Sequence, residues 1–68
     1  MNEKLKDRLT YRAKEVCQLL GIGKTTLYAM EKQGLIPKGF MLTERIKVWN
    51  AEEIKSWLKA KQEEQNHQ

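Results

Sequence analysis

Apolar side chains recur with a helical period near the start of the chain. A single stripe at the i, i+3, i+4, i+7 spacing predicts a first helix over residues 13–20, and its members are Ala13, Val16, Cys17 and Leu20. Gly21 is expected to end this helix, because glycine adopts the left-handed C-cap conformation at little cost.

A second amphipathic stretch follows after the short Gly21-Ile22-Gly23 turn and predicts a helix over residues 24–33. Gly23 lies at its N-cap position, and Gly34 is expected to stop it, with Pro37 preventing resumption. At about 100° per residue, Leu27 and Met30 fall on the inner face. The outer face then carries Thr25, Tyr28, Ala29 and Lys32.

A period of two replaces the helical period between residues 38 and 49. Phe40 and Leu42, then Ile46 and Val48 after a polar turn, alternate with more exposed positions. This pattern predicts a two-stranded hairpin, which must pack against the helices because a lone hairpin is marginally stable in water. The segment 9–11 is a candidate for a third, edge strand.

The third helix is expected over residues 51–61. Asn50 is a good N-cap and Glu53 occupies the N3 position, an arrangement like a capping box. Its apolar stripe contains Ile54, Trp57 and Leu58, with the aliphatic part of Lys61 at the edge.

The elements therefore predict a mainly α protein with a small β-hairpin, in the order helix, tight turn, helix, hairpin, helix. With 68 residues there is room for one small domain, which we place at 9–61. The polar, aperiodic segments 1–8 and 62–68 are expected to be flexible.

The distribution of charge along the chain indicates what kind of partner it binds. The chain has 13 Lys and Arg against nine Asp and Glu, a net charge of +4. Residues 12–47 hold seven of the cations and three of the acids, so the excess lies in the middle of the domain and not in a tail. Such a distribution is typical of a protein that binds a polyanion, although a basic, merely soluble surface would give the same count.

Two short helices joined by a glycine turn form a helix-turn-helix candidate, whose second helix enters the DNA major groove. The polar outer face of the second helix suits that task. Thr25 can reach a phosphate or a base edge, Tyr28 can bind phosphate or pack on a thymine methyl group, and Lys32 can reach the backbone or guanine. The alternative is an ordinary solvated helix face.

Several segments distributed along the chain form a recognisable set. They are Arg12-Ala13-Lys14-Glu15-Val16, Gly21-Ile22-Gly23-Lys24-Thr25-Thr26-Leu27-Tyr28, Gly34-Leu35-Ile36-Pro37-Lys38, Arg45, Trp49 and Glu53-Ile54-Lys55-Ser56-Trp57-Leu58. Together they resemble the AlpA family of phage and prophage regulators. These proteins are small winged helix-turn-helix proteins related to the MerR-type DNA-binding domain and to phage excisionases. The resemblance covers about residues 9–60.

The resemblance implies that the hairpin is a wing whose tip contacts the DNA backbone or minor groove, and Arg45 matches a basic wing position. Gly23, Ala29 and Thr43 depart from the residues common in the family. The candidate DNA-binding residues are Arg12, Lys24, Thr25, Tyr28, Ala29, Lys32, Lys38, Arg45 and Lys47.

Other chemistry finds little support in the sequence. Gly23-Lys24-Thr25 mimics the end of a P-loop, but Gln18 stands where that motif needs glycine. Cys17 lies on an apolar stripe, His67 has no neighbouring ligand, and the two tryptophans fit core positions better than base stacking. We therefore expect no enzymatic activity, no metal and no cofactor, and a cytoplasmic protein that does not enter the membrane.

The function predicted is sequence-specific binding of double-stranded DNA by a protein of phage or mobile-element type. It would act as an excisionase that assists an integrase, as a transcriptional regulator, or as both. The chain is expected to be a monomer in solution that binds repeated sites cooperatively. The alternative is a protein-interaction module or anti-regulator that uses the same fold; the target DNA sequence is left open.

Overall fold

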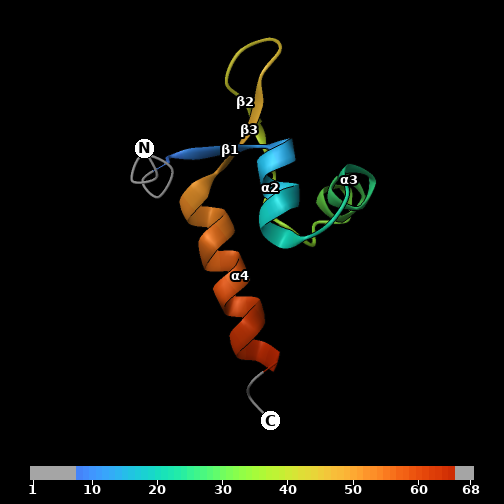
Figure 1. Cartoon of the computed structure of the whole chain (residues 1–68), viewed down its shortest axis with the longest axis vertical. Coiled ribbons are helices and arrows are strands. Elements are labelled where there is room, and N and C mark those ends of the chain that lie inside the picture. Colours follow the sequence, from blue (N-terminus) through green and yellow to red (C-terminus); the bar gives the residue numbers. More distant parts are fainter. Residues whose placement is uncertain (1–7, 66–68) are drawn as a thin grey trace.

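The computed structural model describes residues 8–65 and contains three helices and a three-stranded sheet within that range (Figure 1). In chain order the elements are β1 (Thr10–Arg12), α2 (Ala13–Leu20), α3 (Lys24–Lys32), β2 (Phe40–Met41), β3 (Lys47–Asn50) and α4 (Ala51–Gln65). This mainly helical architecture with a small antiparallel sheet is compatible with a winged helix-turn-helix fold. The predicted fold class is thus confirmed, including the edge strand before the first helix.

The helix-turn-helix unit has the bounds that the apolar stripes predict. Gly21 has φ 70°, the left-handed conformation expected at the end of α2, and the Ile22 N–H donates to the Cys17 carbonyl at 3.0 Å. α3 begins after Gly23 and ends at Lys32, one residue before the expected end. Gly34, at φ 76°, then turns the chain out of the helix.

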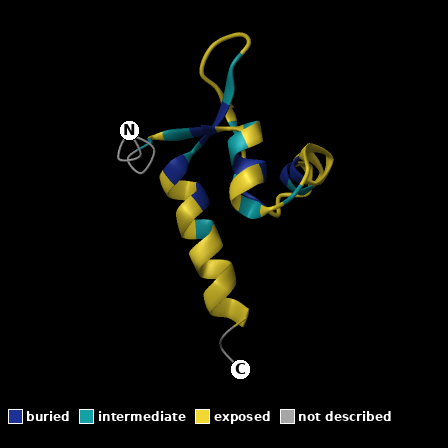
Figure 2. Ribbon diagram, viewed as in Figure 1, coloured by how far each residue is buried: buried dark blue, intermediate teal, exposed yellow. Residues whose placement is uncertain are grey.

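One apolar core joins the three helices to the sheet. Val16, Leu27 and Trp49 are fully buried in it, and Ile54 brings α4 against the same cluster. Cys17 is also buried in the core, as its position on the first stripe predicts. Figure 2 shows buried residues on β1 and β3, at the start of α4, and on one side of α2 and of α3.

The sheet has the strand order β1-β3-β2, and both pairings are antiparallel. β3 is therefore the central strand, with Trp49 opposite Tyr11 and Lys47 opposite Met41. We call β2, β3 and the connecting residues 42–46 the wing; it projects from the top of the molecule in Figure 1.

The expectation for the wing needs one correction. Phe40 pairs with Val48, so the predicted apolar positions do share one face of the hairpin. Only part of that face is buried: Val48 is 2% exposed, but Phe40 is 45% exposed and Leu42 58%. The face turned towards the helices carries Lys47 and Trp49, because the large Trp49 ring belongs to the core.

α4 begins as predicted and continues further. The Glu53 N–H donates to Asn50 Oδ1 at 2.9 Å, which confirms Asn50 as the N-cap. The helix runs to Gln65 and not to residue 61, and its C-terminal half is exposed (Figure 2). Leu58, expected on the buried stripe, is 45% exposed. Of α4, Ala51, Ile54 and Trp57 pack on the core, and the helix then continues past it. The expected flexible segments fall largely on residues 1–7 and 66–68, which lie outside the described residues.

Candidate nucleic-acid interface

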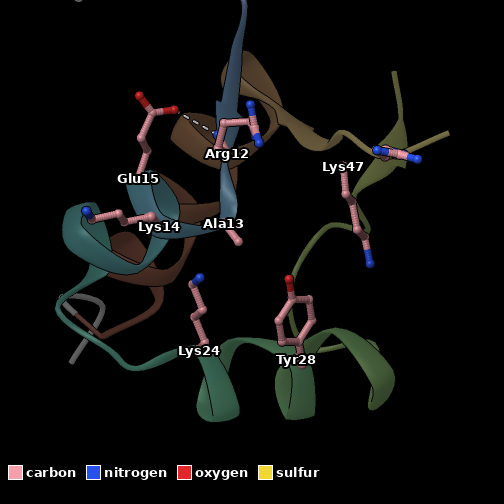
Figure 3. Close-up of a pocket in the computed structure, with 8 residues that line it drawn as sticks. Arg12, Ala13, Lys14, Glu15, Lys24, Tyr28 and Lys47 are labelled. Atoms are coloured by element: carbon pink, nitrogen blue, oxygen red, sulfur yellow. Dashed lines mark hydrogen bonds between the residues drawn. The ribbon is translucent and has the colours of Figure 1, made fainter. Parts of the chain in front are cut away.

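A cleft of about 480 Å3 opens between the start of α2, the start of α3 and the wing. Figure 3 shows Lys24 and Tyr28 pointing from α3 towards Ala13 and Arg12, with Lys47 approaching from the side of the wing. Eight residues line this cleft: Arg12, Ala13, Lys14, Glu15, Lys24, Tyr28, Arg45 and Lys47.

The local structure explains why these side chains meet. Arg12 ends β1 and is also the N-cap residue of α2, so it lies at the corner between the strand and the helix. Lys24 and Tyr28 are four residues apart on α3 and therefore share one face of that helix. Gly23 provides no side-chain cap, so the positive end of α3 is not neutralised by a side chain at its N-cap.

The charges of the cleft are not equivalent. Glu15, its one carboxylate, is bound by the Arg8 guanidinium and also accepts a hydrogen bond from the Arg12 N–H at 2.8 Å. Lys47 is paired with Glu31. The remaining cations of the cleft form no ion pair within residues 8–65, and these are Arg12, Lys14, Lys24 and Arg45. The cleft therefore presents unneutralised positive charge around the Tyr28 side chain.

Glu31 links α3 to the wing. It is 9% exposed, and its two carboxylate oxygens accept hydrogen bonds from two different groups, one in the wing and one just before it. Oε1 accepts from Lys47 Nζ at 2.9 Å, and Oε2 accepts from the Gly39 N–H, just before β2, at 2.7 Å. α3 and the two arms of the hairpin are thus joined through one side chain.

The surroundings of Glu31 favour its ionised form. Burial would by itself raise the pKa of this carboxyl. The hydrogen bonds from Lys47 and the Gly39 N–H oppose burial, as do the positive charges of Lys47 and Lys38. Together they outweigh burial and hold the pKa of Glu31 below its ordinary value, so the carboxylate remains charged at neutral pH.

Lys47 also lies over two aromatic rings. Its Nζ is 5.4 Å from the centre of the Tyr28 ring and 5.2 Å from that of the Trp49 ring, within the range of cation–π attraction. The two rings are themselves in tilted contact, with centroids 6.3 Å apart. Tyr28 is therefore held at the rim of the cleft by contacts from the wing.

Gly39 is needed for this close approach. A Cβ at this position would lie 2.9 Å from Lys47 Cε, 2.9 Å from Trp49 Cε2 and 2.9 Å from the Val48 carbonyl oxygen. No larger side chain fits there without displacing the hairpin backbone or the Trp49 ring.

The structure brings five of the nine predicted DNA-binding residues into the cleft: Arg12, Lys24, Tyr28, Arg45 and Lys47. Thr25, Ala29 and Lys32 are exposed on α3 outside the cleft, and Lys38 is exposed in the connection from α3 to β2. These four residues lie along α3 and in the connection that leads to the base of the wing.

Sequence reasoning missed Lys14 and Glu31. Lys14 is not among the candidate DNA-binding residues named from the sequence, yet it lines the cleft. Glu31 lies four residues after the buried Leu27 and so falls on the inner stripe of α3. A single acid on an apolar stripe is the signal that could have indicated a buried ion pair.

Two further findings bear on function. No helix within the described part of the chain is long and apolar enough to cross a membrane. Nor do three or more His, Cys, Asp or Glu side chains gather among residues 8–65 in a way that could hold a metal ion.

Comparison with known proteins gives one match. A family model described as "Prophage CP4-57 regulatory protein (AlpA)" matches residues 10–62 of the 68. No curated protein and no solved structure matches.

Proposed function

The chain belongs to the AlpA family of prophage regulatory proteins, and from that premise we propose that it binds double-stranded DNA in a sequence-specific manner through α3, the cationic cleft and the wing. The family is a DNA-binding, regulatory and non-enzymatic kind of protein. The match covers β1 through most of α4, so every element that forms the cleft lies within it.

The observation that carries the proposal is the position of the four cations of the cleft that form no ion pair in the described structure. They come from three separate elements, β1–α2, α3 and the wing, and surround the face of α3 that bears Tyr28. Binding to DNA is dominated by neutralisation of phosphates, so cations gathered on the recognition helix and beside it supply the affinity. In this arrangement Arg12, Lys24 and Arg45 contact phosphates.

Sequence reading is assigned to the exposed side of α3. The major groove is about 12 Å wide and admits one helix, whose side chains then reach the base edges. Thr25, Tyr28 and Lys32 are exposed on α3 and carry hydrogen-bonding groups, whereas Ala29 can only contact a thymine methyl group.

The role of the cleft can be tested by removing its charges one at a time. Lys24→Met and Arg45→Met should each weaken binding to any duplex, cognate or random, because phosphate contacts carry no sequence information. Lys59→Met is the matched control, since Lys59 is exposed on α4, outside the cleft. Equal losses for all three variants in anisotropy titrations would contradict the assignment of the cleft.

Specificity requires a different pair of variants. Tyr28→Ala and Lys32→Ala should reduce the preference for a selected cognate site over random DNA, by about 1–3 kcal/mol for each good base contact that is lost. If Arg45→Met alters the preferred sequence and the α3 variants do not, α3 is not the recognition element.

DNA binding by this chain would serve transcriptional regulation, excision, or both. An excisionase must shape DNA for an integrase, and bending a site of 20–30 base pairs costs about 1–6 kcal/mol that the contacts must offset. Cooperative binding to direct repeats with a measurable bend in circular-permutation gels would support excision. A single unbent site overlapping a promoter would support regulation alone.

The alternative of a protein-interaction module predicts an apolar outer face on α3. That face instead carries exposed Thr25, Tyr28 and Lys32, and it borders the cationic cleft. The polar and basic character of this face favours DNA as the partner.

A further inference from the structure

The wing supplies two cations to the cleft, and their surroundings differ. Arg45 is exposed in the connection between β2 and β3 and forms no ion pair within the described residues. Lys47 has a side chain that is 33% exposed, donates to Glu31 and lies over the rings of Tyr28 and Trp49.

We propose that Lys47 and Glu31 are positioning residues, which fix the wing against α3 and hold the Tyr28 ring for DNA, and that Lys47 does not itself contact phosphate. The inference rests on the proposed function, because it concerns how the same surface meets DNA. It revises the direct DNA contact that the sequence suggests for Lys47.

Glu31 is the ion-pair partner of Lys47. Glu31 has a side chain only 12% exposed, and Lys47 is the one cation within hydrogen-bond distance of it in the described structure. If Lys47 turned to a phosphate, the carboxylate would remain buried with a single neutral donor, the Gly39 N–H. Leaving a buried charge without its counter-ion is strongly unfavourable, so DNA must compete with an optimal partner for this ammonium group.

The Tyr28 ring is held by residues of β3. It contacts Trp49 and lies beneath the Lys47 ammonium group, so the same lysine that binds Glu31 also limits where the Tyr28 hydroxyl can point. β3 carries both Lys47 and Trp49, and a displaced wing would therefore release the Tyr28 ring as well. Holding these groups in place before DNA arrives lowers the ordering cost of binding.

Two roles for Lys47 predict opposite results for Glu31→Gln. If Lys47 contacts phosphate, the substitution releases it from its carboxylate and binding becomes tighter. If Lys47 is a positioning residue, the substitution loosens the wing and binding becomes weaker. We expect Glu31→Gln and Lys47→Met each to weaken binding by roughly three- to thirtyfold, which lies within the range of coupling between groups in direct contact.

The experiment compares these two variants, the double variant and Arg45→Met by anisotropy titration of a labelled duplex at several salt concentrations. For the positioning role, the double variant binds about as weakly as either single variant, because both disrupt one interaction. Lys47→Met should leave the slope of log K against log salt unchanged, whereas Arg45→Met, the matched control, should reduce its magnitude by about 0.9.

A tighter Glu31→Gln complex, or a slope reduced by about 0.9 in Lys47→Met, would overturn the inference. Should Glu31→Gln fail to fold by circular dichroism, the slope of Lys47→Met decides alone. If the wild-type chain binds no duplex at low salt, the proposed function fails and this inference fails with it. If the wild type binds DNA and Glu31→Gln binds it more tightly, this inference fails and the proposed function stands.

Discussion

The base of the wing and its tip are built in opposite ways. At the base, Val48 and Trp49 are buried, Gly39 leaves no space for a side chain, and Glu31 joins both arms of the hairpin to α3. At the tip, residues 42–45 are exposed. The tip is closed by local contacts, including the Leu42 N–H to the Ile46 carbonyl at 2.7 Å and the Arg45 N–H to Thr43 Oγ1 at 3.2 Å.

This contrast separates two parts of one hairpin. The base contributes core packing and sets the position of the hairpin, and the tip is exposed. Substitutions at the base should therefore act first on folding and on the geometry of the surface. Substitutions at the tip should act on binding while stability is preserved.

The largest difference is expected between the apolar side chains of the two regions. Trp49→Ala should lower the free energy of unfolding by about 3–5 kcal/mol, because it removes the largest fully buried side chain. Leu42→Ala, at a tip position that is 58% exposed, should cost less than about 0.5 kcal/mol. Urea unfolding followed by circular dichroism measures both, and similar losses would erase the distinction between base and tip.

A single methyl group at the base should also be destabilising. Gly39→Ala places a Cβ 2.9 Å from the Val48 carbonyl oxygen, which cannot move without the backbone, and should cost about 1–3 kcal/mol. Thr43→Ala at the tip is the comparison and should cost at most about 0.5 kcal/mol. Thermal unfolding measures both variants. A Gly39→Ala chain that melts at the same temperature as the wild type would contradict the close packing described at the base.

The Glu31 contact should make the base sensitive to acid. The pKa of Glu31 is lower in the folded chain than its ordinary value of 4.5, so its contribution to stability is fully present above pH 4.5. That contribution is lost as the pH falls through the lower folded pKa. The stability difference between the wild type and Glu31→Gln should therefore be largest near neutral pH and shrink below pH 4.5. Unfolding curves at pH 7, 4 and 3 test this, and a difference independent of pH would count against an ionised Glu31.

The smallest expected effect lies at the tip. Glu44 is exposed beside Arg45, and its negative charge opposes the approach of phosphates. Glu44→Gln should tighten DNA binding by roughly two- to threefold, mainly through faster association, and leave the unfolding curve unchanged. Stopped-flow association at low salt can detect this change, and slower association would place the tip away from DNA.

Much of the helical framework could be predicted from the sequence. The stripe of Val16, Cys17 and Leu20 and the glycine at position 21 gave the bounds of α2, because local periodicity and capping determine a helix of this kind. Asn50 likewise indicated the start of α4. These features depend on neighbours within one or two turns, which a sequence pattern contains.

The wing and the cleft depend on contacts between distant residues, and here the sequence was less informative. Alternation predicted the hairpin but left its register open, and the structure pairs Phe40 with Val48; a period of two also cannot say which face meets the helices. Likewise, the basic residues could be named from the sequence, but the position of Lys14 at the cleft and the burial of Glu31 against Lys47 arise only from packing of α2, α3 and the wing.

The central claim is that the cationic cleft and the recognition helix bind duplex DNA through its phosphates. The most direct test is the affinity of the wild-type chain for a labelled duplex across a series of salt concentrations. With four to six phosphates contacted, the account predicts a linear plot of log K against log salt with a slope of roughly −4 to −5. A flat response, or no binding at low salt, would contradict it.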